Sequence, residues 1–184
     1  MRQIQRVGIA AVACLCGVLV AGAVYADNIY VSITGVKQGK FRGELIEKAF
    51  EDKIAGLSFH YAIVSPRDVA TGMPTGKRMH KPIRLKKAWG TASTQLFQAL
   101  AVNETLSSVV IDFVRPDRTG MMVLDHTIKL INASVASIEQ QTEEGARGLT
   151  HVEIVDLVFQ KIELTDHKSK SIAVDDWNAP LQMP

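Results

Sequence analysis

Strand-type sequence dominates this chain, and it is the feature that most restricts the fold. In Ile29–Val36 and Lys81–Trp89, apolar and polar residues largely alternate. This period is typical of a strand with one buried face. Further strand-type runs are Leu57–Ser65, Ser108–Arg115, Val123–Glu139, Thr150–Leu164 and His167–Trp177, the last expected to be a turn and a short edge strand. No repeat of roughly 20–50 residues is visible, which argues against a solenoid or a propeller.

Two of these runs are irregular. The apolar residues of Thr150–Leu164 change face after Ile154 and again after Phe159. Such switches indicate β-bulges or a strand that is buried on both faces. The run Val123–Glu139 is long enough to be one bent strand or two.

Two segments have a helical period. In Thr91–Glu104, apolar residues pair four positions apart, and Thr91 or Ser93 is placed to cap the N-terminus. The shorter segment Glu44–Asp52 has the same pairing but no clear cap. By contrast, Ser65–Pro82 has several Gly and Pro turn points and no apolar period, so we expect an extended exposed loop. The fold class that fits is a mostly β barrel or sandwich with one main helix packed on its side.

Residues 1–26 have the three-part layout of a secretory signal peptide. Two arginines precede an uncharged apolar run, and Val24 and Ala26 precede the expected cut. We therefore expect cleavage after Ala26, which leaves residues 27–184 as one domain. Two alternatives stay open: a retained anchor, for which the apolar run is barely long enough, and a lipoprotein signal at Cys14, which lacks the usual large aliphatic residue before it.

Cleavage would also remove both cysteines, Cys14 and Cys16. Residues 27–184 would then have no thiol for a disulfide, a nucleophile or a metal. Of the 21 Lys and Arg residues, Arg2 and Arg6 would leave, so 19 basic residues would balance 19 acidic ones. A duplex-binding domain carries a basic field or patch, so we expect no nucleic-acid partner. We also expect no stable membrane insertion after cleavage.

The titratable residues form no recognisable catalytic pattern. The five histidines, at positions 60, 80, 126, 151 and 167, are too far apart for a paired zinc motif. The chain also lacks a GxSxG serine, a P-loop and a dinucleotide glycine pattern. Asp175 and Asp176 are adjacent carboxylates, but near a turn and a terminus a solvated strand end is the simpler interpretation. We therefore expect no catalytic, cofactor or metal site, and no enzyme.

One dense basic cluster lies between residues 77 and 87. It is compatible with a phosphate-rich ligand or an acidic partner surface. The simpler interpretation, which we favour, is a solvated loop and the polar face of the strand that follows. Its members are Lys77, Arg78, Lys81, Arg84, Lys86 and Lys87.

The order of these segments resembles the hemolysin-coregulated protein (Hcp) family, the tube subunits of bacterial type VI secretion. The resemblance begins with DNIYVSITGVKQGKFRGE and continues through TGKRMHKPIRLKKAWGTASTQLFQALAVNETLSSVVIDFVR, HTIKLINASVASIEQ and THVEIVDLVFQKIEL. In that family a strand of the type V-x-I-x-F-x-R follows the helix, and here it is Val109, Ile111, Phe113 and Arg115. The likeness covers nearly all of residues 28–177 and rests on order and spacing.

The resemblance implies a compact β-barrel of two antiparallel sheets with one short helix at its side. It also implies a homohexameric ring, rings that stack into a tube, and a sheath, a spike and effector proteins as partners. The loop Ser65–Lys81 would reach a neighbouring subunit or the next ring. A head-to-tail contact is heterologous, so this basic loop needs an acidic or polar acceptor, which we expect in Gln140–Gly145. The candidate contact residues are Arg67, Lys77, Arg78, His80, Lys81, Glu143 and Glu144.

Two features depart from the family pattern. Family members normally assemble in the cytoplasm and leave through the machine itself, whereas residues 1–26 predict export to the periplasm or the outside. The helix start reads GTAST where many relatives have an acidic residue and a proline. Two other functions stay open: an exported β-barrel that binds a small or protein ligand in an apolar cavity, and, less favoured, an exported hydrolase.

Overall fold

The computed structural model describes residues 28–145 and 148–179, so the expected signal segment lies outside the described residues. Within them, strands are joined by turns, and a single helix, α1 (Thr91–Ala101), follows the sixth strand. The strands are β1 (Asn28–Gly35), β2 (Gly39–Lys40), β3 (Ile54–His60), β4 (Ile63–Val64), β5 (Met79–His80), β6 (Ile83–Ala88), β7 (Leu106–Pro116), β8 (Met122–Gly145), β9 (Gly148–Asp166) and β10 (Ser171–Asp176).

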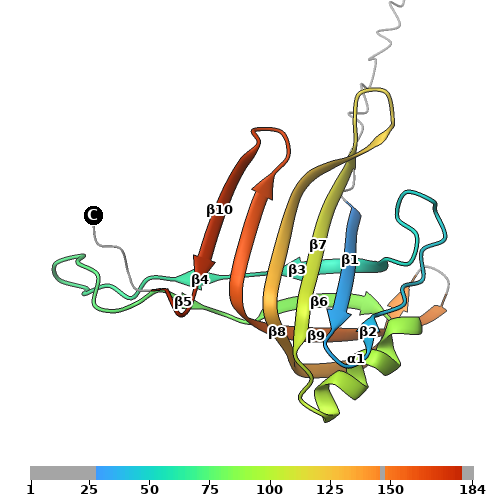
Figure 1. Ribbon diagram of the computed structural model, residues 1–184, viewed down its shortest axis with the longest axis horizontal. Helices are drawn as coiled ribbons and strands as arrows, with labels where there is room; N and C mark the ends of the chain where they lie inside the picture. Colours follow the sequence, from blue (N-terminus) through green and yellow to red (C-terminus); the bar gives the residue numbers. More distant parts are fainter. Residues whose placement is uncertain (1–27, 146–147, 180–184) are drawn as a thin grey trace, which may run out of the picture.

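The strands close into an antiparallel barrel (Figure 1). The main sheet has the order β10-β9-β6-β3-β1-β7-β8, and β8 also pairs with β9, which joins its two ends. β10 extends from β9 as an edge strand, as expected, β2 pairs with β1, and β4 and β5 form a separate two-stranded sheet. This architecture confirms the predicted fold class.

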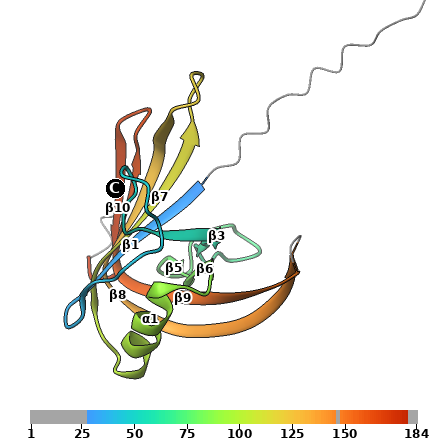
Figure 2. The ribbon, with the colours of Figure 1, turned by 90° about the vertical axis from the view of Figure 1, so that its right-hand side faces the viewer.

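The two longest strands, β8 and β9, curve around one end of the barrel (Figure 2). The predicted irregularity is real, but the bulge lies in β8, where the register shifts between Val135 and Ser137. β9 is buried on both faces at Val152 and Glu153. The run Val123–Glu139 is therefore part of one bent strand.

The core fills the barrel and the space under α1. Val31, Ile33, Leu85, Ile111 and Leu130 are fully buried inside the barrel. Ala92, Leu96 and Ala99 bring one face of α1 into the same cluster. Each fully buried Leu or Ile contributes about 1.5–3 kcal/mol relative to exposure, so apolar packing supplies most of the stability of this part.

The helix has different ends from those expected. The N-cap is Gly90, and not Thr91 or Ser93. The backbone N–H of Gly90 donates a hydrogen bond to the hydroxyl of Ser93 at 3.0 Å. α1 ends at Ala101, before Asn103 with its left-handed φ of 49°. Glu104 is thereby turned away from the helix, and its carboxylate accepts hydrogen bonds from the N–H groups of Lys37 and Gln38 at 2.7 and 2.8 Å.

The second expected helix, Glu44–Asp52, does not form. Its backbone closes a loop instead, since the N–H of Asp52 donates to the carbonyl of Leu45 at 2.9 Å. Asp52 adopts a left-handed φ of 62°, which ends any helical path. Phe50 packs on Tyr30 with ring centroids 4.4 Å apart. One anchored aromatic residue therefore replaces the helical face that the spacing predicted.

Candidate assembly surface

A hairpin arm, Ile63–His80, projects from one side of the barrel (Figure 1). Ile63 pairs with His80 and Val64 with Met79, and an isolated bridge joins Arg67 to Pro74. The tip is a turn in which the carboxylate of Asp68 accepts a hydrogen bond from the N–H of Thr71 at 2.8 Å. The expected exposed loop is therefore a partly paired hairpin, which gives it a defined direction.

A network of four side chains holds the root of the arm against β10. His80 lies at its centre, with its side chain only 3% exposed. Its Nε2 is 2.8 Å from Oδ2 of Asp175, and its Nδ1 is 2.5 Å from the hydroxyl of Tyr61. Arg78 binds both carboxylate oxygens of Asp175 and donates to the carbonyl of Asp176 at 2.8 Å. We call these four side chains, Tyr61, Arg78, His80 and Asp175, the root network.

The root network shifts the protonation of its members. Hydrogen bonds from Arg78 hold the pKa of Asp175 below its ordinary value, against burial and with further help from His80. Burial raises the pKa of Tyr61, and the nearby Asp175 adds to the effect. The carboxylate is thus kept charged and the hydroxyl protonated, which suits the hydrogen bonds that each makes.

Aromatic rings pack around this network. The ring of His80 lies 5.4 Å from that of Phe159 on β9 and 5.4 Å from that of Trp177, centroid to centroid. The ring of Tyr61 is also stacked with that of His80, with centroids 6.0 Å apart. Arg78 and His80, both predicted as contact residues, are therefore committed to contacts within the chain.

The other predicted contact residues on the arm differ from these two. Arg67 donates to the carbonyl of Gly72 at 3.0 Å inside the tip and is otherwise exposed. Lys77 and Lys81 are exposed and form no ion pair within residues 28–145 and 148–179. Arg67 and Lys77 are thus the positive charges that the arm presents outward, Lys81 directly follows the arm, and the exposed carboxylate of Asp68 is used within the turn at the tip.

The rest of the basic cluster is neutralised inside the molecule. Arg84 binds Asp156 through two hydrogen bonds of 2.9 Å, and Lys86 binds Glu143 at 2.6 Å. Lys87 points into the core and binds Glu153 at 2.9 Å. The cluster therefore does not form a continuous anion-binding patch, because its strand-borne members already have carboxylate partners.

Of the predicted acidic acceptors, only Glu144 is without an ion-pair partner among the described residues, since Glu143 is held by Lys86. Both glutamates lie near the end of β8, on the side of the barrel opposite the arm (Figure 1). The structure thus does not bring the predicted basic and acidic contact residues together within one chain.

The sequence did not reveal the partners of the arm. The interpretation of Asp175 as a solvated strand end is wrong, because its carboxylate binds Arg78 and His80. Tyr61 stands out in the sequence only as part of a strand-type run. Nothing in one sequence links residues 78 and 80 to residue 175. For Lys87 the sequence did contain a signal. Side chains alternate along β6, so Lys87 falls on the same face as the buried Leu85 and is expected to point inward.

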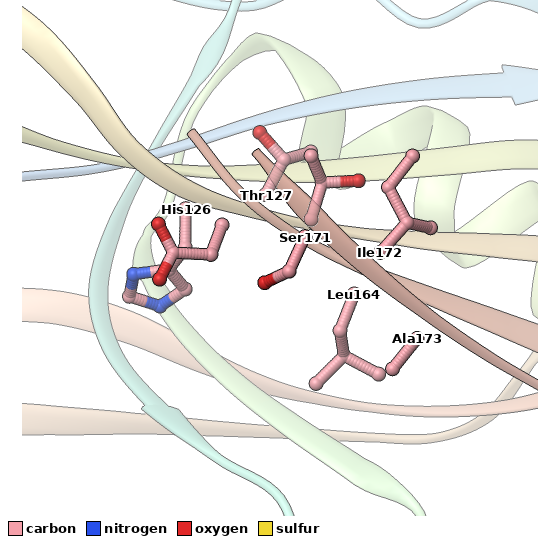
Figure 3. A pocket seen from close by; sticks show the side chains of 8 residues that line it. His126, Thr127, Leu164, Ser171, Ile172 and Ala173 are labelled. Carbon is pink, nitrogen blue, oxygen red and sulfur yellow. The ribbon is translucent and has the colours of Figure 1, made fainter. Parts of the chain in front are cut away.

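A small pocket lies between β8, β9 and β10 (Figure 3). Its volume is about 260 Å³, and its lining includes His126, Leu164 and Ile172. Small-molecule sites usually measure roughly 300–1,000 Å³. Nδ1 of His126 lies 3.0 Å from the neighbouring carboxylate of Asp125 and not in a set with other ligating groups. A pocket below this range does not favour the ligand-binding alternative.

Two specific features, a cluster of metal ligands and a membrane-spanning helix, are not present among the residues that the structure describes. Among those residues, no three His, Cys, Asp or Glu side chains gather as metal ligands do. The helix α1 is also too short and too polar to cross a bilayer.

Known proteins with similar sequences point to one family. A family model described as "Type VI secretion system effector, Hcp" matches residues 30–165. The major exported protein of Pseudomonas aeruginosa is 32% identical over 169 residues, which cover 85% of this chain and 98% of that protein.

Solved structures give the same result. The secreted protein Hcp3 from Pseudomonas aeruginosa has a TM-score of 0.70 and 28% identity, covering 84% of this chain and 100% of that one. Hcp1 from the E. coli EAEC 042 pathovar has a TM-score of 0.75 and 24% identity, covering 83% of this chain and 99% of that one, and supports the fold alone. The closed barrel, its single side helix and these matches show that the chain belongs to the Hcp family, the tube subunits of type VI secretion.

Proposed function

We propose that this chain assembles into a homohexameric ring, and that rings stack into a type VI secretion tube. The match to 98% of the length of the Pseudomonas aeruginosa relative carries the proposal, because the whole tube-subunit domain is present. The arm supports it as well. A projection on one side and unpaired charge on the opposite side suit a heterologous contact, which closes into rings.

The first experiment measures the mass of residues 27–184 by light scattering during size exclusion, with negative-stain images of the same peak. We expect a mass near six subunits and annular particles. A matched variant replaces the arm residues 65–78 by Asn-Gly, which allows a tight hairpin turn, and should lower the mass without unfolding the barrel. A wild-type protein that stays monomeric at high concentration would contradict the proposal.

We further propose that the protein is exported and that residues 1–26 are a signal cleaved after Ala26, leaving the domain 27–184. The relative from Pseudomonas aeruginosa is itself named an exported protein. N-terminal sequencing of exported protein tests the cleavage. A start at Asp27 supports it, and a start at Met1 would favour a retained anchor.

The spike, the sheath and effector proteins are the partners proposed for such a tube, with effectors carried in the ring lumen. Membership of a structural family argues against catalysis as the main role. Pull-down with purified rings, compared with the arm-shortened variant, tests partner binding. A partner that needs the lumen should bind to rings and not to subunits.

A further inference from the structure

An apolar groove runs between α1 and β8. It has a volume of about 650 Å³ and is lined by Trp89, Thr94, Phe97, Gln98, Leu100, Ile138 and Gln140. Two large aromatic side chains lie in it and stay open to solvent, with Phe97 60% and Trp89 45% exposed. The groove is therefore a surface feature of the helix side of the molecule.

Packing of α1 against the barrel does not require the aromatic side chain of Phe97. α1 already buries Ala92, Leu96 and Ala99 against the barrel. Phe97 points away from that face, at a position where a surface helix normally has a polar residue. Exposed aromatic side chains that gather in a groove mark a contact site in soluble proteins. The groove thus lacks a cover within the described residues.

The arm has the complementary character. Its tip presents Val69, which is fully exposed, and Met73, which is 65% exposed. Ile63, Val64 and Met79 are also open to solvent along the arm. Methionine adapts its shape to aromatic surfaces and gains from sulfur–ring contacts. Burying these apolar side chains would lower the free energy of the arm, and an apolar groove is a surface on which they can be buried.

Charge agrees with this fit. Ile138, Gln140 and Glu144 share one face of β8, because side chains alternate along a strand beyond the bulge. Glu144 is exposed and has no ion-pair partner among the described residues. On the arm, Lys77 is exposed and equally unpaired among them. Glu144 lies farther along β8 than the groove, and Lys77 lies behind the turn at the tip of the arm, so the two surfaces carry charges of opposite sign beside their apolar parts.

The groove and the arm of one chain lie apart. Figure 1 shows the arm on the side of the barrel opposite α1, and in Figure 2 α1 lies in front of the barrel while the arm lies behind it. The arm is also fixed in this direction by the root network. A chain therefore cannot fill its own groove with its own arm, and the matching surface belongs to another copy.

We propose that the tip of the arm, Arg67–Lys77, docks into the groove between α1 and β8 of a second copy of this chain. Val69 and Met73 would lie against Phe97 and Trp89, with Lys77 facing Glu144. This inference rests on the proposed function and names the acceptor surface for the arm. The contact is heterologous, so one copy gives an arm and receives another.

Thiol crosslinking tests the pairing directly. The full chain is prepared with Cys14→Ala and Cys16→Ala, which removes the cysteines of the sequence. Met73→Cys is introduced into one sample and Thr94→Cys into another, and the two are mixed and treated with a short bis-maleimide. We expect covalent dimers in the mixture at least tenfold above those in either sample alone. Lys168→Cys, in the turn after β9, replaces Thr94→Cys as the matched control and should give background levels.

A second variant measures the energetic role of the groove. Phe97→Ser should raise the concentration needed for assembly at least tenfold and leave the barrel folded by circular dichroism. Val102→Ser removes an exposed apolar residue directly after α1 that does not line the groove, and should assemble normally.

The outcomes separate the two proposals. Rings that form without crosslinking above the control, or that form equally well with Phe97→Ser, would overturn the docking and leave the ring function standing. A wild-type chain that does not assemble at all would overturn both.

Discussion

Two ion pairs of similar chemistry hold two different parts of this protein. Lys87 and Glu153 lie inside the barrel, with side chains 1% and 0% exposed, and the hydroxyl of Ser93 on α1 donates to the same carboxylate at 2.8 Å. Arg78 and Asp175 lie at the root of the arm, with side chains 23% and 25% exposed. The first pair fixes the helix to the barrel wall. The second pair fixes the direction of the arm, and the barrel does not depend on it for its packing.

The buried pair should give the largest effect. Glu153→Ala leaves the Lys87 ammonium without its carboxylate in the core, and breaking such a pair costs about 3–5 kcal/mol. We expect the free energy of unfolding to fall by this amount, measured by urea denaturation at fixed protein concentration. Glu163→Ala, which removes a partly exposed partner of Lys161, should cost less than about 1 kcal/mol.

A double variant sharpens this result. Lys87→Met with Glu153→Leu removes both charges together and keeps apolar volume in the core, so most of the loss should be recovered. If the double variant were as unstable as Glu153→Ala, packing and not charge would be the reason for the loss.

The root of the arm should give a smaller and more local effect. Asp175→Asn removes the charge that Arg78 and His80 share, so the arm should open more often while the barrel keeps its stability within about 1 kcal/mol. Limited trypsin digestion at the basic residues of the arm measures this, and we expect cleavage to accelerate about tenfold, the equivalent of about 1.4 kcal/mol.

Asp176→Asn is the matched control. The side chain of Asp176 accepts a hydrogen bond from the backbone N–H of Asn178 and not from the arm, and the backbone carbonyl of residue 176 remains available to Arg78. Equal digestion rates for the two variants would mean that Asp175 does not hold the arm.

The smallest expected effect depends on pH. A carboxylate whose pKa lies below its ordinary value of about 3.9 stabilises the folded arrangement above that value, and the stabilisation is lost as the pH falls through the lowered pKa. The root network should therefore persist from neutral pH to about pH 4 and open below it. Fluorescence of Trp177, measured in a Trp89→Phe background, reports this change because Trp177 packs on His80.

Asp175→Asn should remove that transition in Trp177 fluorescence. Circular dichroism measured in parallel separates opening of the arm from unfolding of the barrel. A fluorescence change that coincides with loss of strand signal would assign it to global unfolding.

The strands were predictable because side chains along a barrel strand alternate between the buried interior and the surface. This pattern is visible within a short segment of sequence. Ile83 and Leu85 showed their inward face directly, and β6 follows that pattern. The same reasoning failed for Glu44–Asp52, because the helical spacing of Leu45 and Phe50 says nothing about which of them finds a partner. Only Phe50 did, on Tyr30.

The candidate contact surface was predictable only in part. The sequence located the arm and its charges, since Gly, Pro and Lys mark an exposed segment. It could not show that Arg78 and His80 are used within the chain, because their partner Asp175 lies 97 residues from Arg78. The groove was equally hidden, since Phe97 has the same helical period as the buried residues beside it.

The position of β9 has a consequence for how the chain reaches this structure. β9 supplies ladder partners to β6, β8 and β10, so no nascent chain can complete the barrel before these late residues emerge. Pairings between distant segments also form slowly, because a long loop must close before they contribute stability. A growing chain therefore exposes open strand edges for most of its synthesis. The proposed export of this chain in an extended form would have to take place within that interval.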